Sequence, residues 1–311
     1  ILGYINPNHL VGGALKLNAD KARRVFEEKI AKPLGLSLEH AAYGAHQIAA
    51  SNMIRAIKAV STERGRDPRD YALFAFGGNG PVFAAGMADA LQMKQIVVPP
   101  SPGLFSSFGL LYADVEHHYS RTFRRLMREI NVNELRSEWD RLSDQAKQQL
   151  EADGFTSEQI QIHRSASMHY QGQTFELRVF LQDSQLDENA ISKLEEAFGQ
   201  EHEQTYGHRA GPEEPVEIVN LHVVGQGIPD ESRVPDKLQI TRPEGEPQEA
   251  VRRAYFGLDK GWLDTPVVTR SALTKGRMGP LIVEEYDATC VLPPQTTICV
   301  DDYGNILIEL G

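Results

Sequence analysis

The sequence has few cysteines, no long apolar run and no excess of positive charge. Two cysteines, Cys290 and Cys299, give no disulfide framework and no metal-binding spacing, so reduced thiols and a cytoplasmic location are expected. No apolar run approaches the ~20 residues of a membrane span, and the first residues do not read as a secretory leader, so no membrane partner is expected. A formal net charge of −11 argues against nucleic acid as a partner.

Catalytic and metal-binding signatures are also missing. The sequence contains no G-x-S-x-G elbow and no H-E-x-x-H motif. His117 and His118 are neighbours on a predicted strand, where their side chains point to opposite faces and cannot bind one metal ion together. Asp114 and Glu116 keep a metal site open as an alternative, but a polar strand face is the favoured interpretation, so no metal ligand is assigned.

The composition is that of an ordinary globular protein, with 41% hydrophobic and 24% charged residues among 311. This length predicts two or three domains. A shift to Pro, Glu, Asp and Lys over 227–249 indicates a linker or a long loop, and the short β-rich runs that follow predict a small barrel or sandwich. The expected domains are therefore 1–125, then 126–226 as an α+β extension of the same core, the 227–249 linker, and 250–311.

Residues 71–107 are the most informative stretch of the chain. An apolar run stops at the turn GGNGP (77–81), a helical pattern follows, and a second apolar run covers 96–98. The order strand, glycine turn, helix, strand predicts a βαβ unit with parallel strands, and such sheets bind ligands beyond the carboxyl ends of the strands. The turn matches neither G-x-G-x-x-G nor G-x-x-x-x-G-K-[ST], so a tight turn that binds nothing is the alternative.

Local patterns predict the remaining elements. Asn18 and Ser37 are placed to cap two helices that run to about residues 31 and 63. Residues 131–152 predict a charged amphipathic helix, and 104–115 predict a short buried helix that feeds a strand. Residues 165–181 alternate across a glycine, which predicts a hairpin or a bulged strand.

Seven stretches, in order over nearly the whole chain apart from the 227–249 loop, carry a resemblance to a known family. They are LGYINPNHLVGG (2–13), AAYGAHQIAASNMIRAIKAVSTERGRDPRDYALFAFGGNGP (41–81), VVPPSPGLFSSFGLLYADV (97–115), MHYQGQTFEL (168–177), YGHR (206–209), PVEIVNLHV (215–223) and GPLIVEEYDATCVLPP (279–294). On these stretches the chain resembles the C-terminal portion of the hydantoinase A/oxoprolinase family, which also includes acetone carboxylase β-type subunits.

The resemblance implies the ATPase fold of actin, sugar kinases and heat-shock proteins. This chain would supply one α/β lobe, followed by an α+β segment and a small β-rich C-terminal domain. The segment FAFGGNGP (74–81) would be the adenosine-side motif, with Gly77, Gly78, Asn79 and Gly80 near adenine and ribose. The family's D-x-G-G-T phosphate-binding turns do not occur in these 311 residues. The chain is therefore expected to be the C-terminal segment of a longer enzyme or a separate subunit, completed by an N-terminal lobe or partner chain in an oligomer.

Three further residues are candidates for cofactor binding. Asn52 lies in the second predicted helix, although a solvated polar position is the commoner explanation for such a residue. Ser106 and Ser107 follow the turn after the second strand, so they could face the same cleft as the glycine turn. Catalytic residues are not assigned.

The sequence departs from the family pattern at four positions. His169 and Ser167 stand where relatives more often carry Arg and Asp, and Phe105 and Phe108 occupy positions that are commonly smaller. If these side chains contact substrate, the specificity is unusual. If they only pack, nothing changes.

The resemblance implies an enzyme that hydrolyses cyclic amides of the hydantoin or 5-oxoproline class after ATP-dependent phosphorylation of the carbonyl oxygen, with ATP and Mg²⁺ as cofactors. The chain alone is expected to be inactive, because the phosphate-binding motifs are missing from it. The alternative is a non-catalytic or assembly subunit of a multisubunit ATP-dependent ketone carboxylase or hydantoinase.

Overall fold

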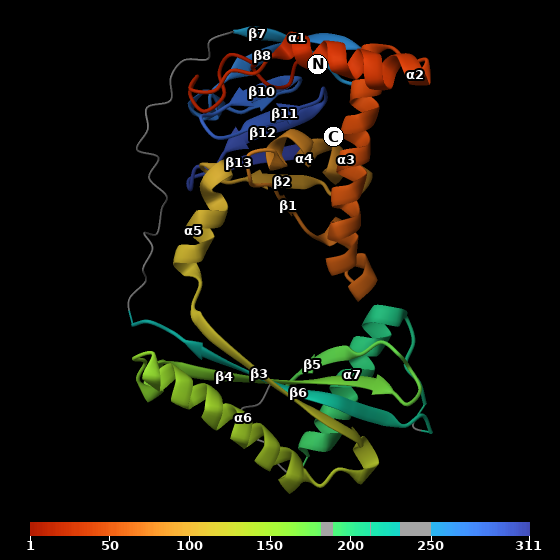
Figure 1. Ribbon diagram of the computed structural model, residues 1–311, viewed down its shortest axis with the longest axis vertical. Helices are drawn as coiled ribbons and strands as arrows, with labels where there is room; N and C mark the ends of the chain where they lie inside the picture. The colour runs from red at the N-terminus through yellow and green to blue at the C-terminus, as the bar shows by residue number, and fades with distance from the viewer. Residues whose placement is uncertain (182–188, 212, 231–249) are drawn as a thin grey trace. The chain divides into compact units, whose positions relative to one another are not determined.

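The computed structural model describes residues 1–181, 189–211, 213–230 and 250–311, and these form two compact units (Figure 1). The first unit contains residues 1–62, 67–111 and the described part of 235–311. The second contains residues 63–66 and the described part of 112–234. The expected linker at 227–249 lies outside the described residues except for 227–230. Within the described ranges, no helix has the length and apolar character needed to cross a membrane.

The first unit combines two sheets with helices that come from the N-terminal part of the sequence. Its five-stranded sheet has the order β1-β2-β13-β12-β9, and its four-stranded sheet has the order β11-β10-β8-β7. The helices are α1 (Ala19–Phe26), continued by a π-helical turn (Glu27–Ala31), α2 (Lys32–Leu34), α3 (Leu38–Val60), α4 (Gly80–Ala90) and α5 (Phe105–Tyr112). The strands are β1 (Leu73–Phe74), β2 (Gln95–Val98), β7 (Val251–Tyr255), β8 (Trp262–Val268), β9 (Arg277–Met278), β10 (Leu281–Glu284), β11 (Thr289–Leu292), β12 (Thr296–Val300) and β13 (Ile306–Leu310).

The predicted βαβ unit is confirmed. Strands β1 and β2 pair in parallel, and α4 is the crossover between them. Pro81 lies in the first turn of α4, where its missing N–H leaves no hydrogen bond unmade. The predicted caps are confirmed as well, since the side chains of Asn18 and Ser37 accept hydrogen bonds from the first turns of α1 and α3.

The β-rich C-terminal region joins the βαβ unit instead of forming a body of its own. Strand β13 pairs antiparallel with β2, and β12 pairs with β13 on its other side (Figure 1). The two sheets and α4 share one apolar core, which includes Ala84, Ile96, Val283, Ile298 and Ile308. The observed units therefore differ from the expected domain boundaries, because backbone pairing with β2 draws 250–311 into the first unit.

The N-terminal segment lies along strand β7. The carbonyl oxygen of Leu2 accepts a hydrogen bond from the backbone N–H of Tyr255 at 2.9 Å, and the Tyr4 hydroxyl donates to the Tyr255 carbonyl at 2.6 Å. Gly3 has a φ of +80°, and a Cβ there would lie 2.0 Å from the Arg253 carbonyl oxygen, so only glycine fits. This close approach of Gly3 to β7 fixes where the following segment, residues 5–11, begins.

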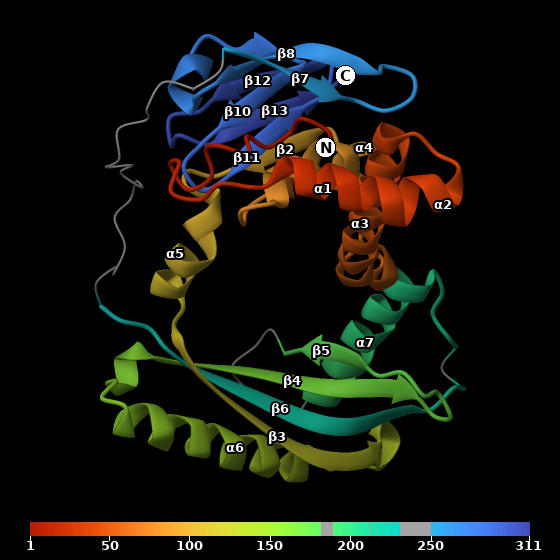
Figure 2. The same ribbon diagram turned by 45° about the horizontal axis from the view of Figure 1, so that its top comes forward.

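The second unit is an antiparallel sheet with two helices. The strands are β3 (Val115–Leu126), β4 (Ile160–Tyr170), β5 (Leu177–Phe180) and β6 (Val216–Gly227), in the order β3-β6-β4-β5. Figure 2 shows α6 (Val132–Ala152) along one face of this sheet, and α7 (Ala190–Tyr206) ends at Gly207 in a left-handed conformation. The predicted hairpin is confirmed by the pairing of β4 with β5. The predicted core face of α6 is also confirmed, and it comprises Leu135, Trp139, Leu142, Ala146 and Leu150.

The burial expected for the helix after Gly103 is wrong. Helix α5 forms as predicted, but none of its residues is buried, and Leu110 is 75% exposed. Its apolar composition suggested burial, whereas the described residues contact the helix mainly through its phenylalanine rings. Phe105 lies 5.3 Å from Phe74 and 5.6 Å from Phe108 between ring centroids.

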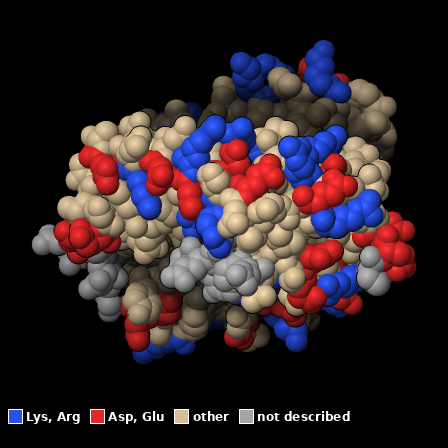
Figure 3. Space-filling model, turned by 90° about the horizontal axis from the view of Figure 1, so that it is seen from below, with Lys and Arg blue, Asp and Glu red and all other residues tan. Residues whose placement is uncertain are grey.

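Charged side chains of both signs alternate over the face drawn in Figure 3, without an extended area of one sign. Ion pairs of the second unit include Arg164 with Asp140 at 3.3 Å. The two adjacent histidines bind different carboxylates: His117 contacts Asp153, and His118 contacts Glu116. This divergence agrees with side chains on opposite strand faces. Such exposed pairs contribute at most about 1 kcal/mol each.

Helices α3 and α4 meet at a stacked pair of rings. His46 of α3 lies face to face with Phe83 of α4 at 4.3 Å, and Tyr4 meets His46 edge-on at 5.5 Å. Burial lowers the pKa of His46 from its ordinary value of 6.5, because the packed rings disfavour the charged imidazolium. In the second unit, burial and the nearby Arg178 likewise lower the pKa of His222.

These two histidines predict a loss of stability in mild acid. As the pH falls below the ordinary value of 6.5, the unfolded chain takes up protons before the folded chain does, so the free energy of unfolding decreases. We expect His46→Gln and His222→Gln each to flatten this slope, and the double variant to flatten it most. Chemical denaturation at several pH values between 7.5 and 5, about the range where histidine titrates, measures the effect. Slopes unchanged in both variants would contradict it.

Candidate functional site

A cavity of about 240 Å³ lies in the first unit, where three segments of the chain meet. One wall is the N-terminal segment 5–11, another is the start of α4, and the third is the loop 284–289 between β10 and β11. The lining residues are Ile5, Asn6, His9, Leu10, Val11, Gly78, Asn79, Val82, Glu284, Glu285, Tyr286, Asp287, Ala288 and Thr289.

The glycine turn forms the wall at the carboxyl end of β1. Gly77 has a φ of +84°, a conformation that favours glycine, and its N–H donates to the Pro102 carbonyl at 2.6 Å. A Cβ on Gly78 would lie 3.5 Å from the Asp287 carbonyl oxygen, which is an ordinary contact. Asn79 precedes α4, and its side chain makes no capping hydrogen bond, so its amide is available to a ligand.

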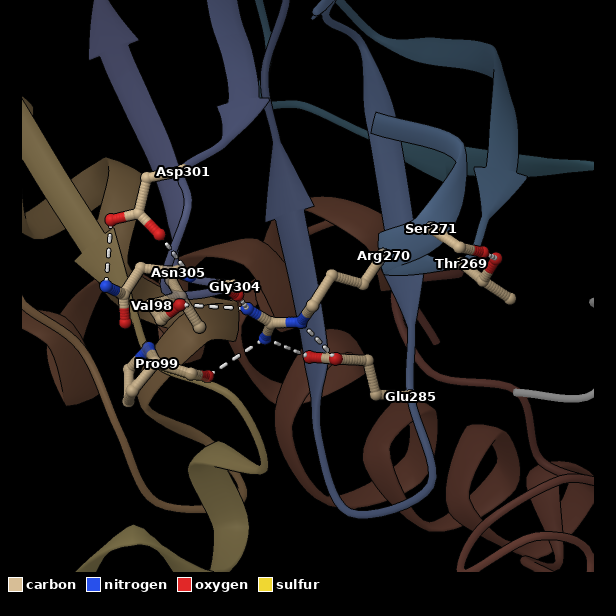
Figure 4. Close-up of polar contacts among 9 residues, drawn as sticks. All are labelled: Val98, Pro99, Thr269, Arg270, Ser271, Glu285, Asp301, Gly304 and Asn305. Atoms are coloured by element: carbon tan, nitrogen blue, oxygen red, sulfur yellow. Dashed lines mark hydrogen bonds and ion pairs between the residues drawn. The ribbon is translucent and has the colours of Figure 1, made fainter. Parts of the chain in front are cut away.

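The loop 284–289 is held by buried Arg270, from the 3-10 turn Arg270–Leu273 (Figure 4). The guanidinium binds both carboxylate oxygens of Glu285, at 2.7 and 2.8 Å. It also donates to the carbonyl oxygens of Val98, Pro99 and Gly304 at 3.1, 2.9 and 2.6 Å. One side chain therefore joins the end of β2, the turn before β13 and the cavity loop.

The N-terminal wall is fixed by a second buried ion pair. Arg252 donates to Glu284 at 2.6 Å, and both side chains are less than one-tenth exposed. Buried Asn6 donates to the other oxygen of Glu284 at 3.4 Å and accepts from the N–H of Asn8 at 3.0 Å. This local turn brings His9 to the cavity.

Two polar atoms in the cavity wall are buried without a hydrogen-bond partner. They are Nδ1 of His9 and Oδ2 of Asp287. The other two lining carboxylates, Glu284 and Glu285, are neutralised by the arginines behind them. Neither lysine nor arginine lines the cavity among the residues that the structure describes. The wall therefore offers a carboxylate acceptor at Asp287 and an unpartnered imidazole nitrogen at His9, which donates or accepts according to its tautomer.

These residues fit a nucleoside better than a phosphate or a metal ion. Sugar hydroxyls and the adenine amino group are neutral donors, whereas phosphate groups are usually met by Lys, Arg or a glycine-rich loop carrying a lysine. Among the residues that the structure describes, no group of three or more metal-binding side chains is present. Mg²⁺ usually takes one or two carboxylates together with substrate phosphates, and only Asp287 of the lining carboxylates is without an arginine partner.

The structure brings together some of the predicted site residues. Gly78 and Asn79 line the cavity, and Gly77 and Gly80 flank them in the same turn. The other three do not line it: Asn52 is exposed on α3 and accepts a hydrogen bond from Arg55, and Ser106 and Ser107 are exposed on α5. Roles for those three residues stay predictions.

The four positions that depart from the family pattern have neighbours within their own unit. Ser167 lies 2.9 Å from Nε2 of His222, and Nε2 of His169 lies 2.8 Å from Glu217. Phe105 and Phe108 contact each other at 5.6 Å. None of these four residues lines the cavity.

Sequence reasoning missed the residues that face the cavity from distant segments. Asn6 and His9 lie in LGYINPNHLVGG, and Asp287 lies in GPLIVEEYDATCVLPP, both of which carried the resemblance. Their place in these stretches was the only signal in the sequence, because the three positions do not form a known catalytic motif. For Arg270 no sequence signal existed, since its partners are backbone carbonyls far away in the chain.

Replacing Arg270 tests its role in holding the cavity loop. Arg270→Met would remove the guanidinium that binds both oxygens of Glu285 and three backbone carbonyls, and breaking such a buried pair costs about 3–5 kcal/mol of unfolding free energy. Arg277→Met, at an exposed position of the same unit, is the matched control and should change stability by less than about 0.5 kcal/mol. Denaturant titration measures both variants, and equal stability of the two would contradict the role.

Two family descriptions together match nearly the whole chain. The family description "Hydantoinase/oxoprolinase" matches residues 1–119, and "Hydantoinase/oxoprolinase C-terminal domain" matches residues 124–309. An uncharacterized protein of Methanocaldococcus jannaschii is 33% identical over 311 residues, which cover 99% of this chain and 43% of that protein. Caprolactamase subunit alpha of Pseudomonas jessenii is 31% identical over 320 residues, covering 100% of this chain and 45% of the subunit.

Two further relatives are informative. Acetophenone carboxylase gamma subunit of Aromatoleum aromaticum is 30% identical over 322 residues, covering 99% of this chain and 43% of that subunit. The crystal structure of ATP-dependent caprolactamase from Pseudomonas jessenii superposes with a TM-score of 0.81 at 28% identity, over 100% of this chain and 45% of that one. This chain thus spans less than half the length of these relatives.

Proposed function

The chain belongs to the hydantoinase/oxoprolinase family, and on that premise we propose that it supplies the nucleoside-binding cavity of an ATP-dependent enzyme. The proposed reaction is hydrolysis of a cyclic amide of the hydantoin or 5-oxoproline class. The observation that carries the proposal is the cavity wall itself. It joins Gly78 and Asn79 of the glycine turn to unpartnered polar atoms of His9 and Asp287, with no lysine or arginine among the described lining residues.

The chemistry explains why ATP is needed. Resonance protects an amide carbon from attack by water, and phosphorylation of the carbonyl oxygen removes that protection, with Mg²⁺ offsetting the phosphate charge. The residues of this chain bind and orient the nucleoside. The backbone at Gly78 lets the ligand come close, and Asn79 presents an amide at the start of α4.

Phosphate handling is assigned to another part of the assembly. The 311 residues contain no D-x-G-G-T turn, and no lysine or arginine of the described ranges lines the cavity. An N-terminal lobe or a separate subunit is therefore the proposed partner, and an oligomer is the proposed state. The relatives named as subunits of caprolactamase and acetophenone carboxylase support a multichain enzyme.

A second candidate is an assembly subunit of an ATP-dependent ketone carboxylase. The 30% identity with a subunit of acetophenone carboxylase favours it. ADP release by the complete enzyme separates the two candidates. Release that depends on a cyclic amide supports the hydrolase, and release that depends on a ketone together with bicarbonate supports the carboxylase.

Filling the glycine turn tests the nucleoside assignment. Gly78 has an ordinary backbone conformation and room for a Cβ, so Gly78→Val should fold, while its methyl groups occupy space at the cavity wall. We expect ATP affinity of the complete enzyme to fall about tenfold or more, since each 1.4 kcal/mol of lost binding is a factor of ten. Calorimetry measures it.

The matched control is Gly86→Val, on the exposed side of the same helix, where no atom lies within 4 Å of the added Cβ. That variant should bind ATP as the unaltered enzyme does. Equal ATP affinity of the two variants, with far-ultraviolet circular dichroism unchanged in both, would refute the assignment of the turn.

A further inference from the structure

Asp287 is an unsatisfied acceptor in the cavity wall. Its Oδ2 atom is buried and has no hydrogen-bond partner. A buried polar group without a partner costs about 1–3 kcal/mol and is rare in native proteins. His9 contributes a second such atom, Nδ1, to the same cavity. Two unmet polar atoms in one small cavity indicate a ligand that meets them.

The backbone around Asp287 is fixed tightly. A Cβ on Gly103 would lie 2.6 Å from the Asp287 carbonyl oxygen, so glycine there lets the turn after β2 press against the loop. The N–H of Glu285 donates to the Ala288 carbonyl at 3.0 Å and closes the loop around Asp287. Arg270 then clamps Glu285 from behind. The backbone that carries the Asp287 side chain is therefore held in position before any ligand arrives.

The ligand group that meets Asp287 has to be a hydrogen-bond donor. An ionised carboxylate only accepts hydrogen bonds, and the neighbouring Glu284 and Glu285 are already paired with arginines. Apolar side chains of Leu10 and Val82 line the same cavity, which suits the carbon face of a sugar or base. Among the described residues, no lysine or arginine lines this wall to neutralise a phosphate.

We propose that Asp287 accepts hydrogen bonds from the ribose hydroxyls of the bound nucleotide and so selects ribonucleotides over deoxyribonucleotides. The assignment rests on the proposed function, because it names the residue of that nucleoside cavity that binds the ribose. The vicinal hydroxyls of ribose are two neutral donors on adjacent carbons, and one carboxylate can accept from both.

Nucleotide analogues test the assignment without altering the protein. The complete enzyme is titrated by calorimetry with ATP, 2′-deoxyadenosine triphosphate and 3′-deoxyadenosine triphosphate. Hydrogen bonds to charged groups are among the stronger ones, so removing a hydroxyl that Asp287 receives should weaken binding about tenfold or more.

Two variants locate the preference. Asp287→Asn keeps the shape of the side chain, and it should lower ATP affinity and abolish the preference for ribose. Asp264→Asn, at an exposed position of β8 in the same unit, is the matched control and should keep both. Inosine triphosphate, which lacks the adenine amino group, serves as a third ligand.

The outcomes separate this inference from the proposed function. ATP binding without discrimination against the deoxy analogues, or discrimination that survives in Asp287→Asn, overturns the role of Asp287 and leaves the nucleoside cavity standing. Discrimination against inosine triphosphate that Asp287→Asn alone abolishes would assign the carboxylate to the base and overturn it as well. Absence of any nucleotide binding to the complete enzyme overturns the proposed function, and the role of Asp287 with it.

Discussion

The buried side chain of Arg270 connects three segments of the first unit. Its guanidinium is buried, and it binds the Glu285 carboxylate together with three backbone carbonyl oxygens (Figure 4). Those carbonyls belong to the end of β2 and to the turn before β13. A buried cation is tolerated only when its hydrogen bonds are met, so these segments are obliged to converge. Because Glu285 binds the same guanidinium, the position of the 284–289 loop is fixed together with these segments.

A second buried arginine holds the other side of the cavity in the same way. Arg252 neutralises Glu284 and approaches the N-terminal segment, whose residue Asn6 also binds Glu284. Two adjacent glutamates thus point to two different arginines and are withdrawn from ligand binding. Asp287, two residues after Glu285, lines the cavity with one buried oxygen that has no hydrogen-bond partner.

Local physics explains what the sequence could predict. The βαβ unit, the caps at Asn18 and Ser37, and the core face of α6 follow from periodicity and from short-range hydrogen bonds. The pairing of β13 with β2 joins residues about 200 apart in the chain, and no local pattern encodes it. The exposed α5 shows the converse, since an apolar composition gives no information about what packs on a helix.

In the candidate site, too, some residues were predictable from the sequence and others were not. Gly78 and Asn79 were predicted because a glycine turn after a strand has a known relation to ligands. Asp287 and His9 were not, because each is an ordinary residue until folding buries it beside the turn. Resemblance to a family located the stretches that contain them. The proposed roles of Asp287 and His9 could be inferred only from the interatomic distances and the burial of their polar atoms in the structure.

The most direct test of the nucleoside cavity is calorimetric titration of this chain with adenosine and, separately, with Mg·ATP. Because the described cavity wall offers Asp287 as an acceptor for a nucleoside and no lysine or arginine for phosphate, both ligands should bind weakly and with affinities within about tenfold of each other, a difference of about 1.4 kcal/mol. Binding of Mg·ATP far tighter than adenosine would contradict the account, because the phosphates would then be held by this chain. Binding of neither ligand would contradict the nucleoside cavity itself.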